Sequence, residues 1–505
     1  MTAETVIIRR YNAVYDQVFA DPGVTQELRD HFSFEVPGAK FHPAVKYGHW
    51  DGIKRLYGAD KKLYRGLRDR LIQFCADRNY DVDAPAWDCN AVNPAAFAEW
   101  CKTIVNPKYT HRDYQLEACL YAIENLRAVM LSPTASGKSL IIYTVLKHFN
   151  LKTMVIVPTQ HLVLQMRDDF IDYGMDPDDI HTVMGGVRES TKPVTITTWH
   201  SAWKEDPEFL EQFQVVIGDE AHGFTAKSMG ILMEKLVNAE VRLGFTGTLG
   251  DSKTNPLVLE GLFGPVKEVT TTKELMDEGH VSQMNIRVIA LKHPEPVRKT
   301  FKKLHSTWPD ELKYLEACPK RNEFLVNLAM SLEGNTIMLF RHVEHGKLLY
   351  EMAQERIKNA AAEWNAGTVP EVAKPWYEAR MKKGIHLVYG GVDKEDRNEI
   401  RYIVEQAESD LIIASYATFS TGTNIKRLHN GIFASPYKSS ITVPQSLGRV
   451  LRLAGDKEEA AIYDVADDVS WKSRQNHTLK HMCRRIQLYA EARIPFKYFK
   501  CDLGS

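Results

Sequence analysis

The amino-acid sequence predicts an α/β protein in which two tandem parallel-sheet units follow a small α+β N-terminal domain and precede a basic helical tail. The first observation is size and composition. A chain of 505 residues, 44% hydrophobic and 26% charged, suits a globular protein of about three or four domains. The second is that short apolar runs alternate with helical patterns twice along the chain. Such runs are typical of parallel strands that helices cover on both faces.

These runs give the order of the elements. The expected strands of the first unit are 128–131, 154–157, 194–197, 215–217 and 242–245. Those of the second unit are 336–340, 385–389, 411–415, 431–434 and 460–465. The intervening helical segments supply the crossovers that parallel strands require. The chain is therefore divided into an accessory domain, two sheet units and a basic helical segment: 1–100, 101–283, 284–470 and 471–505.

Composition excludes several classes of protein. No apolar run approaches the roughly 20 residues that span a bilayer, and no apolar segment of a secretory signal follows Arg9 and Arg10. The seven cysteines are scattered without a C-x-x-C pair, so we expect free thiols in a reduced cytoplasm and neither zinc nor disulfides. The net charge of −1 does not by itself indicate a nucleic-acid partner.

A phosphate-binding loop is predicted between the run 128–131 and the helical pattern that follows. Its residues are Ser132, Pro133, Thr134, Ala135, Ser136, Gly137, Lys138 and Ser139. In such a loop the backbone N–H groups hold phosphates, the lysine reaches the β- and γ-phosphates of ATP, and the Ser139 hydroxyl binds Mg²⁺. The pattern G-x4-G-K-[ST] has serine at 132 in place of glycine, and an ordinary helix start is the alternative.

A pair of carboxylates, Asp219 and Glu220, directly follows the apolar run 215–217. At the carboxyl end of a parallel strand beside a phosphate loop, Asp219 can hold Mg²⁺ and Glu220 can orient or deprotonate the attacking water. The alternative is an acidic pair at a helix N-terminus, where the helix dipole favours it. The pairing with the loop favours catalysis.

Further motifs resemble those of the superfamily 2 helicases and translocases, and they occur in that superfamily's order between about 105 and 470. Upstream of the loop lie Arg112, Asp113, Tyr114 and Gln115. Downstream are Thr159, Thr198, Thr246-Gly247-Thr248, Arg341-His342, the segment 417–425 that contains Gly422, and Gln445-x-x-Gly448-Arg449-x-x-Arg452. The resemblance implies two RecA-like motor lobes that use ATP and Mg²⁺.

The resemblance also implies roles for these residues. Gln115, with Arg112, reads adenine, Thr159 and Thr198 contact the nucleic-acid backbone, and Gly422 lies in the nucleotide site. Gln445, Arg449 and Arg452 belong to the last motif, and an arginine supplied by the second lobe stabilises charge on the transferred phosphoryl group. A solvated arginine pair on a helix is the alternative. The chain departs from the superfamily pattern at Ser132, at Ala135 and in the lack of an aspartate near Gly422.

Two basic stretches interrupt the neutral composition. Residues 40–70 contain nine lysines and arginines against three aspartates, with aromatic residues between them, and residues 472–500 contain eight against one glutamate. Basic groups that meet phosphates and aromatic rings that stack on bases are typical of nucleic-acid binding, and Trp50, Lys54 and Arg55 are the candidate contacts. A solvated face over core aromatics is an equal alternative for both stretches.

Within the superfamily the sequence most resembles the phage UvsW-type helicases. Shared features are the segments 28–35 and 47–52, Pro133-Thr134 in the phosphate loop, and 341–347. This resemblance implies an ATP-driven, DEAH-type enzyme that dissociates RNA–DNA hybrids and remodels branched DNA in phage recombination, repair and replication control. It also implies a monomer in the cytoplasm of a bacterial host, with recombination or single-strand-binding proteins as candidate partners and no membrane partner.

Two other functions stay open from the sequence. A double-stranded DNA translocase moves without separating strands, and an ATP-gated binding switch hydrolyses ATP only to reset its affinity. The acidic pair and the two arginines favour a motor over a switch.

Overall fold

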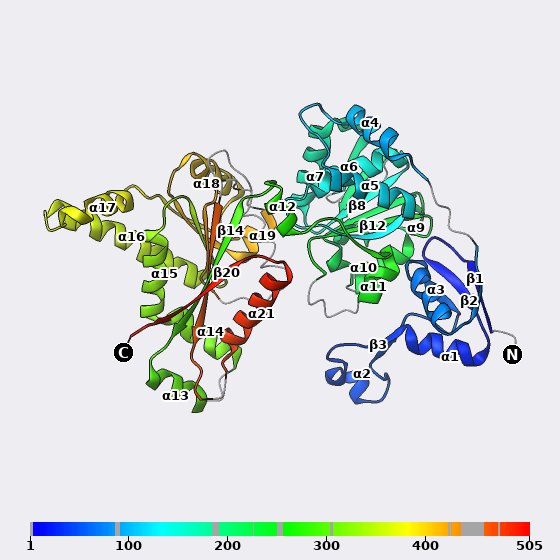
Figure 1. Ribbon diagram of the computed structural model, residues 1–505, viewed down its shortest axis with the longest axis horizontal. Coiled ribbons are helices and arrows are strands. Elements are labelled where there is room, and N and C mark those ends of the chain that lie inside the picture. Colours follow the sequence, from blue (N-terminus) through cyan, green and yellow to red (C-terminus); the bar gives the residue numbers. More distant parts are fainter. Residues whose placement is uncertain are drawn as a thin grey trace. The chain divides into compact units, whose positions relative to one another are not determined.

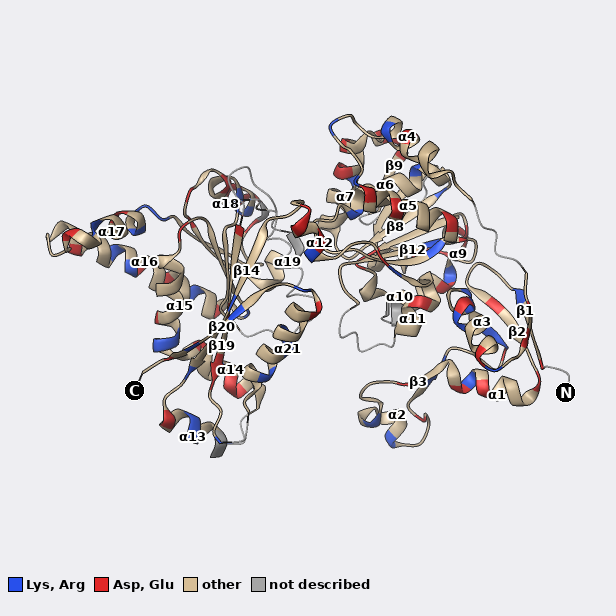
Figure 2. Cartoon of the chain, in the orientation of Figure 1, with Lys and Arg blue, Asp and Glu red and all other residues tan. Residues whose placement is uncertain are grey.

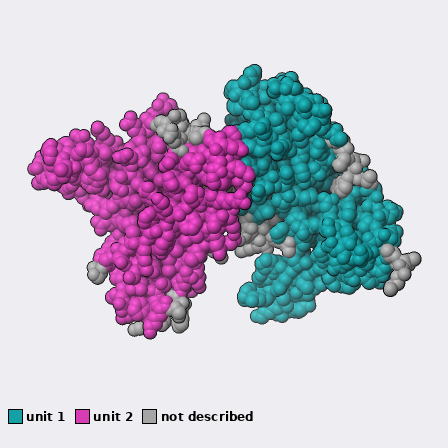
Figure 3. Space-filling model, in the orientation of Figure 1, with its two compact units in different colours: residues 1–270 teal, residues 271–505 magenta. Residues whose placement is uncertain are grey.

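The computed structural model describes residues 4–85, 91–183, 191–225, 227–249, 256–303, 307–422, 425, 427–435, 459–472 and 475–504. They form two compact units, residues 1–270 and 271–505 (Figures 1 and 3). Within the described ranges no helix has the length and apolarity needed to cross a membrane.

The first unit begins with a small α+β module (Figure 1). Its four-stranded sheet has the order β5-β2-β1-β6, and a two-stranded hairpin, β3-β4, extends from it. The strands are β1 (Thr5–Arg10), β2 (Tyr15–Phe19), β3 (Ser33–Glu35), β4 (Ile53–Arg55), β5 (Lys62–Tyr64) and β6 (Asp81–Asp83). The helices are α1 (Pro22–His31), α2 (Pro43–Lys46) and α3 (Arg68–Asp77). Val6, Ile8, Leu28, Phe32 and Phe74 are buried in its core.

The rest of the first unit is built on a seven-stranded sheet of order β13-β7-β12-β11-β8-β10-β9, in which every pairing is parallel. The strands are β7 (Arg127–Leu131), β8 (Thr153–Val157), β9 (Ile180–Val183), β10 (Val194–Thr198), β11 (Val215–Asp219), β12 (Val241–Thr246) and β13 (Val266–Glu268). The helices are α4 (Pro94–Ile104), α5 (Asp113–Asn125), α6 (Lys138–Phe149), α7 (Gln160–Tyr173), α8 (Trp199–Ala202), α9 (Pro207–Glu211), α10 (Lys227–Lys235) and α11 (Pro256–Phe263). The carboxyl ends of β7, β12, β11 and β8 therefore meet at one edge of the sheet.

The second unit repeats this architecture with the strand order β16-β17-β15-β18-β19-β14-β20, again all parallel. The strands are β14 (Gln283–Lys292), β15 (Thr336–Phe340), β16 (Ile385–Val388), β17 (Leu411–Ser415), β18 (Asn430–Phe433), β19 (Glu459–Asp468) and β20 (Phe496–Asp502). The helices are α12 (Thr272–Asp277), α13 (Glu295–Lys303), α14 (Trp308–Ala317), α15 (Pro319–Ser331), α16 (Val343–Asn365), α17 (Lys374–Met381), α18 (Lys394–Gln406), α19 (Tyr416–Gly422) and α21 (His477–Glu491).

The fold class is confirmed, and each expected strand is present within a few residues of its expected bounds. Four strands of the two large sheets were missed, namely β9, β13, β14 and β20. In β14 polar and apolar residues alternate over its first half, so it lacks the continuous apolar run by which buried strands were recognised. After the expected C-terminal helix, α21, the chain adds β20 beside β14, so the tail is an integral part of the second unit.

Candidate active site

The phosphate loop joins the carboxyl end of β7 to the first turn of α6. Ser132 N donates to the Thr246 carbonyl at 2.8 Å, which attaches the loop to the end of β12. The Lys138 ammonium donates to the Ser132 carbonyl at 3.2 Å, and so lies over the loop. The loop residues Thr134 and Ser136 precede the N-cap residue, Gly137, which begins a twelve-residue helix with open N-terminal amides. This arrangement suits an anion such as a phosphate group.

Two loop residues adopt left-handed backbone conformations. Gly137 has φ of 78°, and a Cβ there would lie 2.3 Å from Gln115 Nε2. Ala135, where the superfamily commonly has glycine, has φ of 70°, a conformation that costs an L-residue about 1–2 kcal/mol. Ser132, in place of the expected glycine, is buried and its hydroxyl bonds with that of Ser136 at 2.5 Å. The loop thus accommodates serine at 132 through a hydrogen bond and alanine at 135 in a left-handed conformation.

The two carboxylates lie at the end of the neighbouring strand. Asp219 is the last residue of β11 and pairs in register with Phe245 of β12, and Glu220 follows with φ of 51°. Burial and the adjacent charge of Glu220 raise the pKa of Asp219 to about 6, although Lys138 acts in the opposite direction. Asp219 Oδ1 and Glu220 Oε2 are buried and accept no hydrogen bond from any described residue. Unsatisfied buried acceptors of this kind are costly, which favours a ligand-binding role.

These residues fit Mg²⁺ and the phosphates of ATP. Magnesium takes oxygen ligands and is commonly held by one or two carboxylates together with phosphate oxygens and water. Asp219 supplies an unsatisfied carboxylate oxygen, and Ser139 supplies a hydroxyl in the first turn of α6, where it bonds with the Tyr173 hydroxyl at 2.8 Å. Lys138 supplies the positive charge for the phosphates. The assignment of Ser139 and Asp219 as metal ligands stays a prediction.

His222 links the carboxylates to the end of β12, a connection that sequence reasoning missed. Its Nδ1 lies 2.9 Å from Thr246 Oγ1 and 3.4 Å from Glu220 Oε2, the latter without hydrogen-bond geometry. Burial lowers the pKa of His222, so the ring is neutral at pH 7. Thr246 Oγ1 also donates to the Thr248 carbonyl at 2.7 Å. His222 therefore lies between Glu220 and the Thr246-Gly247-Thr248 segment and is hydrogen-bonded to that segment.

Gln115 lies beneath the loop. Its Nε2 donates to the Ser136 carbonyl at 2.8 Å, and its Oε1 accepts from the backbone N–H of Arg112 at 2.9 Å. The Tyr114 hydroxyl donates to the same Ser136 carbonyl and accepts from the Arg112 guanidinium. Gln115 is 3% exposed, so its amide holds the loop in this structure and contact with adenine requires these bonds to exchange. The adenine-reading role of Gln115 and Arg112 stays a prediction.

The two threonines expected to contact nucleic acid cap helices. Thr159 Oγ1 accepts from Leu162 N at the start of α7, and Thr198 Oγ1 accepts from Ser201 N at the start of α8. Thr198 is the last residue of β10 and Thr159 comes two residues after the end of β8, so both lie at the same edge of the sheet. Each hydroxyl therefore has a structural role as an N-cap, whatever it contacts in addition.

Of the second-unit residues, Gly422 ends α19 and the Arg341 backbone N–H donates to Ser435 Oγ at 3.1 Å. Gln445, Arg449 and Arg452 lie outside the described residues.

The basic stretch 40–70 divides into internal and surface cations. Arg65 and Arg68 are buried, and Arg68 makes two hydrogen bonds with Asp16, at 2.7 and 2.6 Å. Arg70 pairs with Glu260 of α11 at 2.5 and 2.8 Å, and so attaches the module to the first large sheet. These three arginines thus pair with carboxylates of the protein itself, an arrangement that differs from the solvated face given as the alternative.

Of the three candidate contacts of this stretch, Lys54 and Arg55 lie in β4 and Trp50 comes three residues before that strand. Figure 2 shows basic residues around α2 in the same part of the chain. Lys54 is exposed, Arg55 pairs with Asp51 at 2.5 Å, and Trp50 is half-buried with its indole N–H donating to the Ile53 carbonyl at 3.0 Å. Two other aromatic residues of the stretch, Phe41 and Tyr47, were not among the candidate contacts, and they are 80% and 70% exposed. The signal in the sequence was a ring directly after a lysine, as in Lys40-Phe41 and Lys46-Tyr47.

Comparisons with known proteins agree with this geometry. The N-terminal domain of the DNA helicase UvsW matches residues 6–84, and the res subunit of type III restriction enzymes matches residues 108–251. The ATP-dependent DNA helicase uvsW of Enterobacteria phage T4 is 33% identical over 499 residues, which cover 93% of this chain and 94% of that protein. The chain belongs to the UvsW family of DNA helicases.

As a member of the UvsW family the chain is an ATP-hydrolysing superfamily 2 helicase, as the motif order predicted. The crystal structure of T4 UvsW matches with a TM-score of 0.50 and 28% identity over 99% of this chain and 100% of that one. The DNA 3'-5' translocase XPB2 of Sulfurisphaera tokodaii is 24% identical and covers 84% of this chain and 92% of its own. The DNA-bound Type ISP restriction-modification enzyme LlaBIII, at 14% identity and a TM-score of 0.52 over 78% of this chain and 32% of its own, shares the fold.

Proposed function

We propose that this UvsW-family helicase uses ATP hydrolysis to separate RNA–DNA hybrids and to remodel branched DNA during phage recombination, repair and replication control. The observation that supports it is the pair of unsatisfied acceptors, Asp219 Oδ1 and Glu220 Oε2, at the sheet edge that carries the phosphate loop. The named activity of the T4 relative, an ATP-dependent DNA helicase, supports DNA as the substrate. We propose that the helicase acts in the cytoplasm of the infected bacterium.

In this proposal each residue has one task. Lys138 and the α6 amides hold the phosphates, Ser139 and Asp219 hold Mg²⁺, and Glu220 orients the attacking water and accepts its proton. Bound Mg²⁺ neutralises charge that develops on the phosphates. Glu220 suits the task because its Oε2 is buried and has no donor among the described residues. We assign Arg449 and Arg452 to stabilise the transferred phosphoryl group, so Arg449→Ala is expected to reduce turnover by about 10³-fold or more.

For nucleic acid we propose the surface that Phe41 and Tyr47 form with Lys40, Lys46 and Lys54. Both rings are mostly exposed, and the Lys40 ammonium lies 5.2 Å from the Phe41 ring centroid. Exposed aromatic rings stack on bases at about 1–3 kcal/mol per base, and lysines neutralise phosphates. Phe41→Ala with Tyr47→Ala is therefore expected to weaken binding to single strands by at least about tenfold. Phe496→Ala, which removes a ring exposed at 38% in the second unit, is the control.

A second candidate is a double-stranded DNA translocase that does not separate strands. It is favoured by the name of the S. tokodaii relative, a DNA 3'-5' translocase.

One experiment separates the two candidates. ATPase and strand displacement are measured together on an RNA–DNA hybrid, a fork, a four-way junction and a plain duplex, with Glu220→Gln as the inactive control. Displaced strand from the hybrid, fork or junction supports the helicase. ATPase stimulated by every substrate with no displaced strand would favour the translocase.

A further inference from the structure

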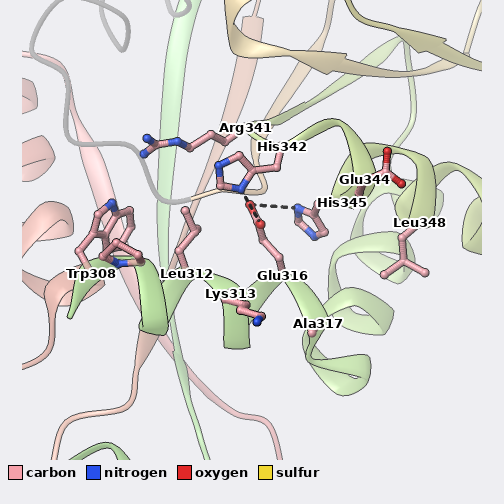
Figure 4. A pocket seen from close by; sticks show the side chains of 11 residues that line it. Trp308, Leu312, Lys313, Glu316, Ala317, Arg341, His342, Glu344, His345 and Leu348 are labelled. Carbon is pink, nitrogen blue, oxygen red and sulfur yellow. Dashed lines mark hydrogen bonds and ion pairs between the residues drawn. The ribbon is translucent and has the colours of Figure 1, made fainter. Parts of the chain in front are cut away.

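A pocket of about 540 Å³ lies in the second unit between α14 and the first turns of α16 (Figure 4). Apolar side chains from both helices line it, including Trp308, Leu312 and Leu348. Its polar residues come from the two helices and from the two residues between β15 and α16, and Figure 4 shows Glu316 between His342 and His345. The pocket follows the carboxyl end of β15, the edge at which parallel-sheet proteins commonly bind ligands.

The hydrogen bonds around His345 fix which of its ring nitrogens carries the proton. Asn322 Nδ2 donates to the Glu316 carbonyl at 2.8 Å, so Asn322 Oδ1 is the atom that lies 3.0 Å from His345 Nε2. An amide oxygen can only accept, and His345 Nε2 therefore donates. Burial, with a smaller effect of the Arg321 charge, lowers the pKa of His345 to about 3, so the ring is neutral. Nδ1 consequently carries a lone pair and is an acceptor.

Two acceptors thus face each other in the pocket. His345 Nδ1 lies 4.0 Å from Glu316 Oε1, and neither atom has a hydrogen-bond partner within the described residues. The other carboxylate oxygen, Oε2, is satisfied by His342 Nδ1 at 2.8 Å. His345 is 3% exposed, so its unsatisfied nitrogen costs free energy unless a donor enters the pocket. A separation of 4.0 Å allows one amino nitrogen to lie within about 2.9 Å of both acceptors.

The remaining lining indicates the chemical class of this donor. Trp308 and the two leucines suit a flat, apolar ring, and Lys313 and Arg341, which also line the pocket, suit a phosphate. Adenine, cytosine and guanine each carry an exocyclic amino group on a flat ring, whereas uracil and thymine present an N–H between two carbonyl oxygens. Those oxygens would meet Glu316 Oε1 and His345 Nδ1 as further acceptors.

We propose that this pocket binds an unpaired nucleobase with an exocyclic amino group, taken from the strand on which the motor acts. Glu316 and His345 then determine specificity by accepting from the amino group, while Trp308 contacts the ring. The site would select cytosine over uracil, two bases that differ chiefly in this group. This inference rests on the proposed function, because it takes a nucleic-acid strand as the ligand.

The test measures equilibrium binding of the full-length chain, without ATP, to short single strands of deoxycytidine and of deoxyuridine at one salt concentration. We expect cytosine strands to bind about tenfold more tightly, as one charge-assisted hydrogen bond provides. In Glu316→Gln the amide oxygen can accept from His342, while an NH₂ donor replaces the carboxylate oxygen that lies 4.0 Å from His345 Nδ1, so the pair of acceptors is lost. That variant is expected to keep its ATPase, to melt no lower than the original protein, and to bind both strands equally.

Glu344→Gln is the matched control. Glu344 also lines the pocket and loses the same charge on substitution, but its side chain is 84% exposed and pairs with Lys347. Its variant should bind all strands slightly more tightly and keep the cytosine preference. Equal binding of both strands by the original protein, as if solvent alone satisfied the acceptors, would overturn the proposal, and so would a preference that survives in Glu316→Gln.

Three further outcomes identify which hypothesis fails. Free cytidine monophosphate that competes as well as the cytosine strand would assign the pocket to a nucleotide ligand and overturn the strand-base proposal. Strand displacement with no preference between cytosine and uracil would reject the pocket assignment and keep the helicase. A cytosine preference without displacement on any substrate would reject the proposed function and keep the pocket.

Discussion

The two large parallel sheets share an architecture but treat their buried carboxylates in opposite ways. In the first sheet, Asp219 and Glu220 at the end of β11 each keep a buried oxygen that no described residue satisfies. In the second, Asp464 of β19 accepts from Arg485 at 2.6–3.0 Å and from the Tyr489 hydroxyl at 2.8 Å. Asp467 of the same strand accepts from Arg321 at 2.9 Å and pairs with His293 at 3.0 Å.

This difference distinguishes carboxylates that are available to bind a ligand from carboxylates that stabilise the fold. When a buried carboxylate pairs with a guanidinium, the protein itself neutralises its charge and occupies its acceptor sites. Such a carboxylate has few acceptor sites available for a ligand. A buried carboxylate whose oxygen is left without a donor destabilises the fold, so it persists where a ligand supplies the missing partner. The same residue type, a buried aspartate on a parallel strand, thus serves two purposes according to its neighbours.

The strongest test of the comparison removes Glu220. Glu220→Gln keeps the shape of the side chain and removes its ability to accept a proton, so kcat for ATP is expected to fall roughly 10²- to 10⁴-fold. The thermal unfolding temperature should not fall, because no internal ion pair is lost. Steady-state ATPase and nucleotide binding are measured together, and near-normal turnover would contradict the catalytic role.

The second test removes one partner of a buried ion pair, Arg485 with Asp464. Arg485→Met leaves Asp464 buried without its guanidinium and is expected to destabilise the second unit by about 3–5 kcal/mol. Hydrogen exchange of amides in β19 and β18 reports this unit by itself. The double variant Asp464→Leu with Arg485→Met should recover much of the loss, because both charges are then removed. An unchanged exchange rate in Arg485→Met would show that the pair is not structural.

The third test uses pH. Although burial alone would lower it, hydrogen bonds to Asp467 and Cys318 raise the pKa of His293 to about 9, from an ordinary value of 6.5. A base whose pKa is raised on folding stabilises fully below its unfolded pKa, so this stabilisation is present at pH 6 and is lost as pH rises through about 9. The loss should be on the order of 1–3 kcal/mol.

Cys318 complicates that measurement, because hydrogen bonds from His293 and others lower the pKa of its thiol despite burial. A thiol with a lowered pKa stabilises at high pH, opposite to His293. The unfolding experiment is therefore carried out in a Cys318→Ser background, with His293→Gln as the control. Equal slopes of stability against pH in both proteins would contradict the assignment to His293.

The smallest expected effect is an increase in stability on substitution of Asp219. Burial and Glu220 raise the pKa of Asp219 to about 6, so holding it ionised at pH 7 costs stability that Asp219→Asn does not incur. Without Mg²⁺ and nucleotide, that variant is expected to be more stable by about 1 kcal/mol or more, while its ATPase is lost. Differential scanning calorimetry at pH 7 measures the gain. A lower melting temperature would place Asp219 with the structural carboxylates.

Much of the fold was predictable because the buried strands are continuous apolar runs. β8 (TMVIV) and β17 (LIIAS) are fully buried, and period and composition identify such segments without knowledge of their neighbours. β20 (FKYFKCD) is mostly exposed, and its pairing with β14 depends on a segment about 200 residues earlier in the sequence. Local pattern carries no information on such a pairing.

The candidate site divides in the same way. By itself the sequence determined the phosphate loop and the Asp219-Glu220 pair, because their residues are contiguous and parallel strands bring their carboxyl ends to one edge. Only the tertiary structure decided which charged groups are internal partners and which remain available for ligands. Contacts between distant segments assign the partners in three cases: Arg68 with Asp16, Arg485 with Asp464, and His345 with Asn322. Each contact stabilises the fold because buried polar groups require a hydrogen-bond partner.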